Sequence, residues 1–451
     1  MTLGPDLVAR RFGYGLPLPA GAPVTASAML QALDGPDRMR AAWPLPLMAD
    51  HLPMLQATAT LRKTQKDKAR DDDRFKQALT ELDHLVMLSL RSTLARALDA
   101  PDGFRERLVA FWANHFCTRA KDRLTVYLPA LLIEEAIRPH LTGPFADMLI
   151  AATTHPAMVL YLDQNVSFGP DSPQGSRKRR GLNENLAREV MELHSLGVGA
   201  AYTQADVRQM AELLTGLTFD LTTGETFDPR RAEPGSETVL GQSYDGKGLQ
   251  PIQAVLRDLA VRPETATHIA TKLARHFVAD DPPPDLVAAL AQAWQHSDGQ
   301  LGTVYHALLT HPSAALAPPA KVRWPLDYMV TGLRALGMTG ADVIDMADGP
   351  FRRRIRRTLT GMGMPWLLPA GPNGFPDTGE DWINPPYLAA RIAWAMRAPT
   401  DMGLRIADPM AVLERALGAS ASAELRTAVA RAETRSEAVG LILASTEMNR
   451  R

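Results

Sequence analysis

Cysteine is almost absent from this chain of 451 residues, which contains only Cys117. A single thiol cannot form an internal disulfide, and it excludes cysteine-based zinc clusters and paired redox motifs. Any metal site must therefore use carboxylate, amide or histidine ligands. Because Cys117 follows the apolar end of an expected helix, we predict that it is buried and unreactive.

The chain also lacks an excess of charge of either sign. It has 49 Lys and Arg residues against 50 Asp and Glu residues, which gives a formal net charge of -1. A general nucleic-acid-binding protein carries a clear basic excess, so this balance argues against that class. We expect no nucleic-acid partner.

Long apolar runs are missing as well. No stretch approaches the roughly 18 apolar residues of a transmembrane helix, and the first residues lack the apolar segment of a signal peptide. We therefore expect no membrane span and, by default, a cytoplasmic protein. Location in the periplasm would need a partner that assists export.

The standard motifs of nucleotide-binding proteins and hydrolases are missing too. The sequence contains no GxxxxGK[ST] loop, no GxGxxG after a strand, no GxSxG elbow and no HExxH. The sequence therefore argues against the reaction classes that depend on these motifs.

The chain does contain enough apolar side chain to bury a core, because hydrophobic residues make up 45% of it and charged residues 22%. Stretches rich in Ala, Leu and charged residues predict helices, among them 67–98, 104–116, 185–195 and 264–277. Many of the 35 prolines stand at helix starts or in loops, where a missing N–H costs little. The predicted fold class is mainly α, a single large multi-helix globular domain.

Two segments depart from the helical pattern. Residues 217–244 combine short β-prone pieces with Gly and Pro, and this composition predicts a small β-hairpin or flap. Residues 365–386 are dense in Pro and Gly and contain Trp366, Phe375 and Trp382. That composition is typical of an ordered loop anchored by aromatic side chains.

These features suggest how the chain is organised. We expect a helical core over residues 1–320 that includes the flap at 217–244. The C-terminal helices and the Pro/Gly/Trp loop of residues 321–451 are expected to pack onto this core as part of one domain. An independent C-terminal domain is the alternative.

The densest polar pattern lies in residues 183–194. At 100° per residue, Asn185, Glu189 and Glu192 fall within about 60° of one another on the expected helix, whereas His194 falls on the apolar side. Paired carboxylates on a helix face bind metal ions or perform acid–base chemistry. The alternatives are a solvated polar face and a buried structural network in which the carboxylates pair with Arg188, Lys272 or Arg275.

Two further residues are candidates for this site. Asp163 ends a short apolar helix, and it either caps that helix or reaches the face that carries Glu189 and Glu192. His115 lies among apolar residues on the helix 104–116. It is either a buried histidine bonded to a neighbour or part of the site.

Basic side chains gather on two other helices. His268, Lys272 and Arg275 share one face of the helix 264–277. A solvated face is the first interpretation, and contact with an anion or with the acidic helix is the second. The run RRRIRR at residues 352–357 predicts a solvated helix face, with an acidic partner as the alternative.

A set of short motifs occurs in a fixed order along the chain: FWANHF (111–116), IRPH (137–140), HPAM (155–158), YLD (161–163), NENLAREVMELH (183–194), LGVG (196–199), YT (202–203), LTG (214–216), KLARHFVAD (272–280) and GPNG (371–374). In these motifs the chain resembles the bacterial domain-of-unknown-function 1800 family over nearly its whole length. The resemblance implies a helical bacterial protein without an established activity. It also implies a companion protein from a second uncharacterised family, numbered 1501, that is similar to sulfatases and alkaline phosphatases.

Two functions are therefore expected, and the sequence leaves both open. The first is an enzyme or metal-binding protein of unknown reaction. Its catalytic candidates are Asn185, Glu189, Glu192 and His115, and a divalent metal ion would be held by Asp163, Glu189 and Glu192. The second is a non-enzymatic partner or maturation factor of the companion sulfatase/phosphatase-like protein.

Overall fold

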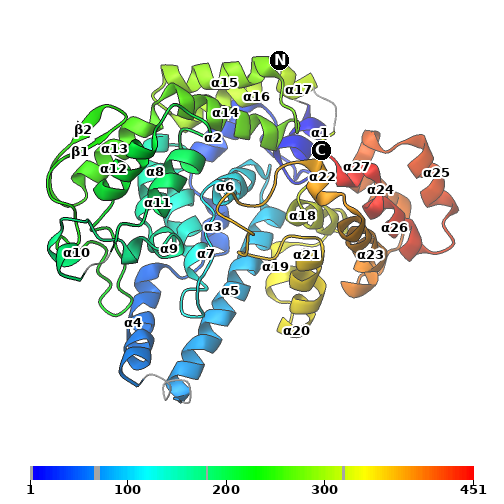
Figure 1. Ribbon diagram of the computed structural model, residues 1–451. Helices are drawn as coiled ribbons and strands as arrows, with labels where there is room; N and C mark the ends of the chain where they lie inside the picture. Colours follow the sequence, from blue (N-terminus) through cyan, green and yellow to red (C-terminus); the bar gives the residue numbers. More distant parts are fainter. Residues whose placement is uncertain (1–3, 66–71, 179–180, 317–319) are drawn as a thin grey trace.

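Helices make up almost all of the regular structure, which confirms the mainly α class that the sequence predicts. Figure 1 shows the computed structural model, which describes residues 4–65, 72–178, 181–316 and 320–451. Within these residues, β1 (Glu237–Val239) and β2 (Gln242–Tyr244) form a two-stranded antiparallel sheet. The described residues contain no helix that is long and apolar enough to cross a membrane.

The helical elements follow one another with short connections, and those written η are 3-10 or π-helical turns. The elements of the N-terminal part are α1 (Pro5–Leu7), η1 (Val8–Phe12), α2 (Ala26–Asp34), α3 (Arg38–Ala42), α4 (Met48–Gln65), α5 (Asp73–Asp99), α6 (Phe104–His115), α7 (Leu128–Leu132), η3 (Ile133–Ile137) and η4 (Arg138–His140). The elements that follow, up to the sheet, are α8 (Phe145–Thr154), α9 (Pro156–Tyr161), η5 (Gln164–Val166), α10 (Pro173–Lys178), α11 (Asn185–Glu189), η6 (Val190–His194) and α12 (Gln204–Leu213).

Helices alone follow the sheet. They begin with α13 (Gln250–Ala260), α14 (Pro263–Phe277), α15 (Pro284–His296), α16 (Leu301–Thr310), α17 (Pro312–Leu316), α18 (Pro325–Ala335), α19 (Gly340–Ile344), α20 (Asp348–Phe351), η7 (Arg352–Arg356) and α21 (Arg357–Gly361). The last elements are α22 (Gly379–Trp382), α23 (Pro385–Asp401), α24 (Pro409–Leu417), η8 (Gly418–Ser420), α25 (Ala423–Arg431), α26 (Arg435–Ala444) and α27 (Thr446–Asn449).

The long helix α5 lies between the two halves of the molecule (Figure 1). The carboxylate of Asp72 caps its start by accepting a hydrogen bond from the N–H of Arg74 at 2.9 Å. The 27 residues of α5 extend about 40 Å. The predicted helix over 67–98 is confirmed from Asp73 onward, and its first residues, 67–71, lie outside the described residues.

Two hydrophobic clusters form the core, and α5 contributes to both. Leu82 and Leu85 of α5 belong to the first cluster, whose other members come from residues 8–314. Leu90 and Leu94 belong to the second, which also contains Tyr14 and residues between 322 and 448. The expected division into 1–320 and 321–451 stays a prediction, because one helix is shared by both clusters.

The small sheet lies inside the segment predicted as a flap. Its strands are joined by Leu240 and Gly241, which both have positive φ values, 52° and 79°. Two such residues form the tight turn that matches the twist of a two-stranded hairpin. An isolated bridge between Leu217 and Phe227 lies earlier in the same segment, which agrees with the predicted extent of 217–244.

The helix expected over 185–195 is only partly α-helical. α11 ends at Glu189, and the chain continues as the π-helical turn η6. A π turn holds an extra residue, so the 100° spacing assumed for the acidic face does not apply beyond Glu189. The uninterrupted α-helix predicted here is therefore wrong in its second half. Apolar spacing alone gives no signal of an inserted residue.

A buried ion-pair network joins α6, α18 and the last residue of the chain. The carboxylate of Asp327 accepts hydrogen bonds from the guanidinium groups of Arg107 and Arg451, and all three side chains are fully buried. Arg107 Nη2 also lies 2.9 Å from His276 Nε2, and Arg451 Nη2 donates to the carbonyl oxygen of His276. Three distant segments are thereby held together.

Replacement of Asp327 by Asn should destabilise the protein by about 3–5 kcal/mol, because two buried guanidinium groups lose the carboxylate that pairs with both of them. Urea unfolding followed by circular dichroism measures the effect. Asp83→Asn is the matched control, because the exposed pair of Asp83 with Arg123 should contribute less than about 1 kcal/mol. Equal losses in the two variants would contradict this account of the network.

Candidate functional site

Three histidines meet where the end of α6 packs against η6 and α14. The ring of His115 lies with its centroid 5.9 Å from that of His194 and 6.3 Å from that of His268. His115 Nε2 lies 3.2 Å from the carbonyl oxygen of His194, and His268 Nε2 lies 3.2 Å from that of Leu193. The last carbonyl groups of a helix lack intrahelical donors. These two histidines therefore satisfy the end of η6, and each carries its proton on Nε2.

His194 is the innermost ring of this cluster. It is almost fully buried, and neither ring nitrogen has a hydrogen-bond partner among the described residues. The prediction that His194 faces the apolar side of its helix is thereby confirmed. A buried polar ring without partners costs free energy, so this position is not explained by packing alone.

Burial keeps these histidines neutral. It lowers the pKa of His194 to about 3 and that of His268 to about 4, and the nearby ammonium group of Lys272 acts in the same direction. The pKa of His115 is lowered well below its usual range by burial and then by Lys272. Burial likewise lowers the pKa of His276 to about 4, against the opposing effect of Asp377.

Lys272 of α14 reaches into the histidine cluster. Its Nζ lies 3.0 Å from His115 Nδ1, the nitrogen that is free to accept when Nε2 carries the proton. Burial lowers the pKa of Lys272 to about 8, although the carboxylate of Asp377 opposes this shift. The solvated basic face expected on this helix is therefore wrong at Lys272 and His268, which contact α6 and η6.

Cys117 follows α6 and lies beside Lys272. Its Sγ lies 3.5 Å from the carbonyl oxygen of Gly371 and 3.3 Å from that of Pro372. Burial raises the pKa of the thiol to about 12, which confirms the predicted buried, unreactive cysteine. The thiol therefore acts as a neutral donor to the loop and not as a nucleophile.

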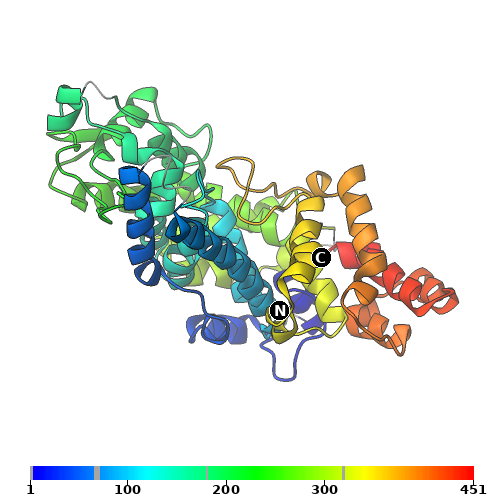
Figure 2. The same cartoon turned by 90° about the horizontal axis from the view of Figure 1, so that it is seen from below.

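The loop between α21 and α22 reaches across to α6 (Figure 2). The side chain of Asn114 donates to the carbonyl oxygen of Phe375 at 2.9 Å and accepts from its N–H at 2.7 Å. Gly374 has a φ of 79°, and a Cβ atom there would lie 2.5 Å from Asn114 Oδ1. Only glycine allows this close approach. The predicted ordered loop is confirmed.

Glu189 approaches the same region from α11. The side chain is half-buried and makes no hydrogen bond or ion pair with the described residues. Burial raises its pKa, and the neighbouring carboxylate of Glu192 adds to the shift. Glu189 also acts electrostatically on Cys117 and Tyr161, and the pKa of Tyr161 is raised to about 12, chiefly by burial. Lys272 contacts His115 and interacts electrostatically with Cys117, which in turn interacts with Glu189 and Tyr161. These five residues are called here the lysine site.

The other acidic side chain of this helix is paired. Arg188 Nη1 lies 3.3 Å from Glu192 Oε1, and its Nη2 lies 3.3 Å from Glu184 Oε2. Gln204 also donates to Glu184 at 2.8 Å. Glu192 is thus held by Arg188 in a partly exposed ion-pair network.

The remaining candidates lie outside the lysine site. Asn185 is exposed at the start of α11. Asp163 pairs with Lys121 and adopts a left-handed backbone conformation with φ of 59°. Within the described ranges, no group of three or more His, Cys, Asp or Glu side chains is arranged to hold a metal ion. The metal site expected from Asp163, Glu189 and Glu192 stays a prediction.

The sequence singled out Lys272 only as part of a basic helix face, and it did not single out Asp377. The spacing of His268 and Lys272 on one helix face was visible, but nothing local showed that this face is covered by α6 and η6. Asp377 also stood in a loop without a recognisable motif. It lies 3.3 Å from His276 Nδ1 and pairs with Lys321.

Residues 8–450 match the model of a family described as "Protein of unknown function (DUF1800)". No curated protein and no solved structure matches the chain. The match covers every residue of the lysine site.

The neutral histidines make stability sensitive to acid. Because their folded pKa values lie below the usual 6.5, the unfolded chain binds more protons between about pH 4 and 6.5. The free energy of unfolding should therefore fall as the pH falls through this window, by up to about 1.4 kcal/mol per pH unit for each histidine. In the His194→Leu variant, unfolding should take up about one proton fewer in this pH window, so the slope should be smaller. The free energy of unfolding at pH 7 should stay the same or rise.

Urea titrations at several pH values measure the slope. His84→Leu is the control for loss of a histidine, because His84 is exposed on α5. An unchanged acid slope in the His194→Leu variant would contradict a buried neutral ring at this position.

Proposed function

The chain belongs to the DUF1800 family, and we propose that it is an enzyme that performs acid–base chemistry at the lysine site. Lys272 is the general base, Glu189 is the general acid, and His115 positions the amine. A small polar molecule is the class of substrate that such a site would serve. The sequence led us to expect acid–base chemistry by carboxylates. The proposal retains Glu189 in that role and adds Lys272 as the base.

The contact of Lys272 Nζ with His115 Nδ1 at 3.0 Å carries the proposal. A lysine on a surface is protonated and useless as a base at neutral pH. With a pKa of about 8, about a tenth of the Lys272 side chains carry a free amine at pH 7. Lysines that act as bases are tuned to this range by burial.

The pKa values of a basic group, Lys272, and an acidic group, Glu189, are both shifted toward neutral pH. The pKa of the Lys272 amine is lowered and that of the Glu189 carboxyl is raised, in both cases first by burial. Both groups can therefore exchange a proton closer to neutral pH than an exposed lysine or glutamate can. His115 has a ring nitrogen bonded to each side, so it holds Lys272 in place without titrating.

A divalent cation is not needed for this proposal. Arg188 neutralises Glu192, and Lys121 neutralises Asp163. Cation binding by these residues would first have to displace both basic side chains. Glu189 is the carboxylate of the expected set that has no ion-pair partner among the described residues.

The reactivity of the Lys272 amine tests the proposal. Acetic anhydride at low dose labels free amines, and peptide mass spectrometry follows each lysine from pH 6 to 11. We expect half-maximal labelling of Lys272 near pH 8. Asp377→Asn should shift the curve to lower pH, because the Asp377 carboxylate raises the pKa of the amine.

The exposed Lys247 serves as the internal reference for the reagent in the same digest. Half-maximal labelling of Lys272 above pH 10 would contradict a role as a base. Failure to label it at any pH would also contradict the role, because a base must be accessible to its substrate.

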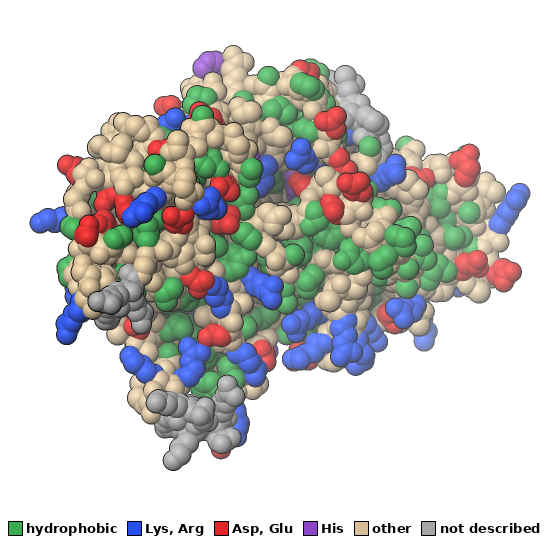
Figure 3. Space-filling view, in the orientation of Figure 1, with side chains coloured by type: hydrophobic (Ala, Val, Ile, Leu, Met, Phe, Trp, Pro, Cys, Tyr) green, Lys and Arg blue, Asp and Glu red, His purple; other side chains and the backbone are tan. Residues whose placement is uncertain are grey.

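A second candidate function, docking to a protein partner, is supported by the outer face of α23. Ile392 and Met396 are 43% and 38% exposed and lie one turn apart, and Ile383 before the helix is 37% exposed. Figure 3 shows hydrophobic side chains gathered over this part of the surface, above a group of basic side chains. Exposed apolar faces of this kind mark interaction sites.

The basic group comes from η7 and α21, which packs against α23. Arg352, Arg353 and Arg357 are exposed, and none forms an ion pair with a described carboxylate. The surface therefore suits a partner with an apolar patch and an acidic rim. The companion sulfatase/phosphatase-like protein implied by the resemblance is the candidate.

Co-purification with that companion protein tests this second function. Ile392→Glu together with Met396→Glu should abolish the complex, because two charges would be buried at its centre. Val198→Glu is the control, because Val198 is 76% exposed on a different part of the molecule. A complex that survives the double substitution would contradict docking at α23.

A further inference from the structure

An apolar cavity of about 90 Å³ lies between α6, η3 and the loop that joins α21 to α22. Ala113 and Cys117 line it on one side, Ile133 on another, and Trp366 of the loop on a third. The loop is fixed over the cavity, because Asn114 holds Phe375 and the Trp366 indole donates to Ser89 Oγ at 2.9 Å. The cavity is therefore a built feature of the fold.

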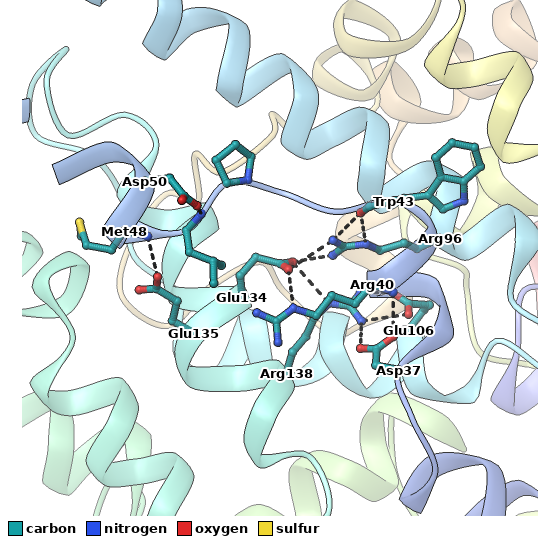
Figure 4. Close-up of polar contacts among 12 residues, drawn as sticks. Asp37, Arg40, Trp43, Met48, Asp50, Arg96, Glu106, Glu134, Glu135 and Arg138 are labelled. Atoms are coloured by element: carbon teal, nitrogen blue, oxygen red, sulfur yellow. Dashed lines mark hydrogen bonds and ion pairs between the residues drawn. The ribbon is translucent and has the colours of Figure 1, made fainter. Parts of the chain in front are cut away.

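The charged side chains that border the cavity form pairs of opposite charge. Figure 4 shows Arg96 and Arg138 facing the carboxylates of Glu134 and Glu106. Arg96 Nη1 lies 2.5 Å from Glu134 Oε1, and Arg138 pairs with both carboxylates. Asp37 pairs with Arg138 and Arg40 pairs with Glu134, so these side chains form one network of opposite charges. A charged ligand would have to break these buried pairs, so the ligand that fits is neutral.

Two uncharged polar groups that border the cavity are left without hydrogen-bond partners among the described residues. Thr118 Oγ1 and Trp324 Nε1 are buried and have no hydrogen-bond partner among the described residues. Their side chains are 4% and 2% exposed. An indole N–H can only donate, so the missing partner must offer an acceptor. Buried groups without partners are costly and need an explanation.

We propose that this cavity is a binding site for a small neutral molecule, mainly apolar, that carries a carbonyl oxygen. The oxygen accepts a hydrogen bond from Thr118 Oγ1, and the hydrocarbon part packs against Ala113 and Ile133. Ligand sites are typically apolar with a few placed polar groups. Benzene, which has six non-hydrogen atoms, fits engineered apolar cavities of about 150 Å³, so about six non-hydrogen atoms is the upper limit for a ligand of this smaller cavity.

This binding site is independent of the acid–base function. Cys117 borders the cavity and also lies beside Lys272, but the proposal needs neither Lys272 nor Glu189. Loss of the lysine site would leave the cavity unchanged. The two proposals are therefore tested by separate variants.

Binding of cyclopentanone and cyclopentane to the full chain tests the site. Ligand-observed NMR titration should give saturable binding of one cyclopentanone per chain. Ala113→Leu fills the cavity and should lower the affinity at least tenfold. Ala389→Leu, on the exposed face of α23, is the matched control and should leave the affinity unchanged.

The carbonyl contact is tested by Thr118→Val, which keeps the shape and removes the hydroxyl. We expect cyclopentanone to bind about five to tenfold more weakly to this variant, and cyclopentane to bind as it does to the unsubstituted chain. Circular dichroism checks that each variant is folded. Absence of saturable cyclopentanone binding, or equal affinities of the Ala113→Leu and Ala389→Leu variants, would overturn the proposal.

Discussion

The buried carboxylate of Asp327 is the group on which the arrangement of the two halves depends. A charge removed from water is stable only when its partners are in place. Asp327 receives Arg107 from α6 and Arg451 from the end of the described chain, and Arg107 continues to His276. Packing of hydrophobic side chains tolerates small shifts, whereas these bonds require one relative position of α6, α14 and α18.

The same network reaches the lysine site. His276 lies 3.3 Å from the carboxylate of Asp377, which belongs to the loop that covers Cys117. Asp377 limits how far the pKa of Lys272 falls, and Asn114 fixes the loop above α6. One set of buried contacts therefore links the position of the loop, the neutral state of the histidines and the lowered pKa of the Lys272 amine. The cavity beside Cys117 shares the same covering loop.

Most of the fold could be predicted from the sequence, because apolar periodicity and capping residues act locally. The helix bearing Lys272 and the loop containing Trp366 were recognised in this way. The π turn after Glu189 was not, because an inserted residue leaves the apolar pattern nearly unchanged. Of the site, His115 and Glu189 were predicted from their helices. The pairing of Lys272 with His115 depends on contacts between distant segments, which no spacing within one helix reveals.

Titration of the Lys272 amine tests the central claim most directly. Lysine labelled with ¹⁵N at Nζ gives an NMR signal that reports its own protonation, and the Lys272→Arg variant assigns that signal. The account predicts a midpoint near pH 8. A midpoint near the ordinary lysine value of about 10.4 would contradict it.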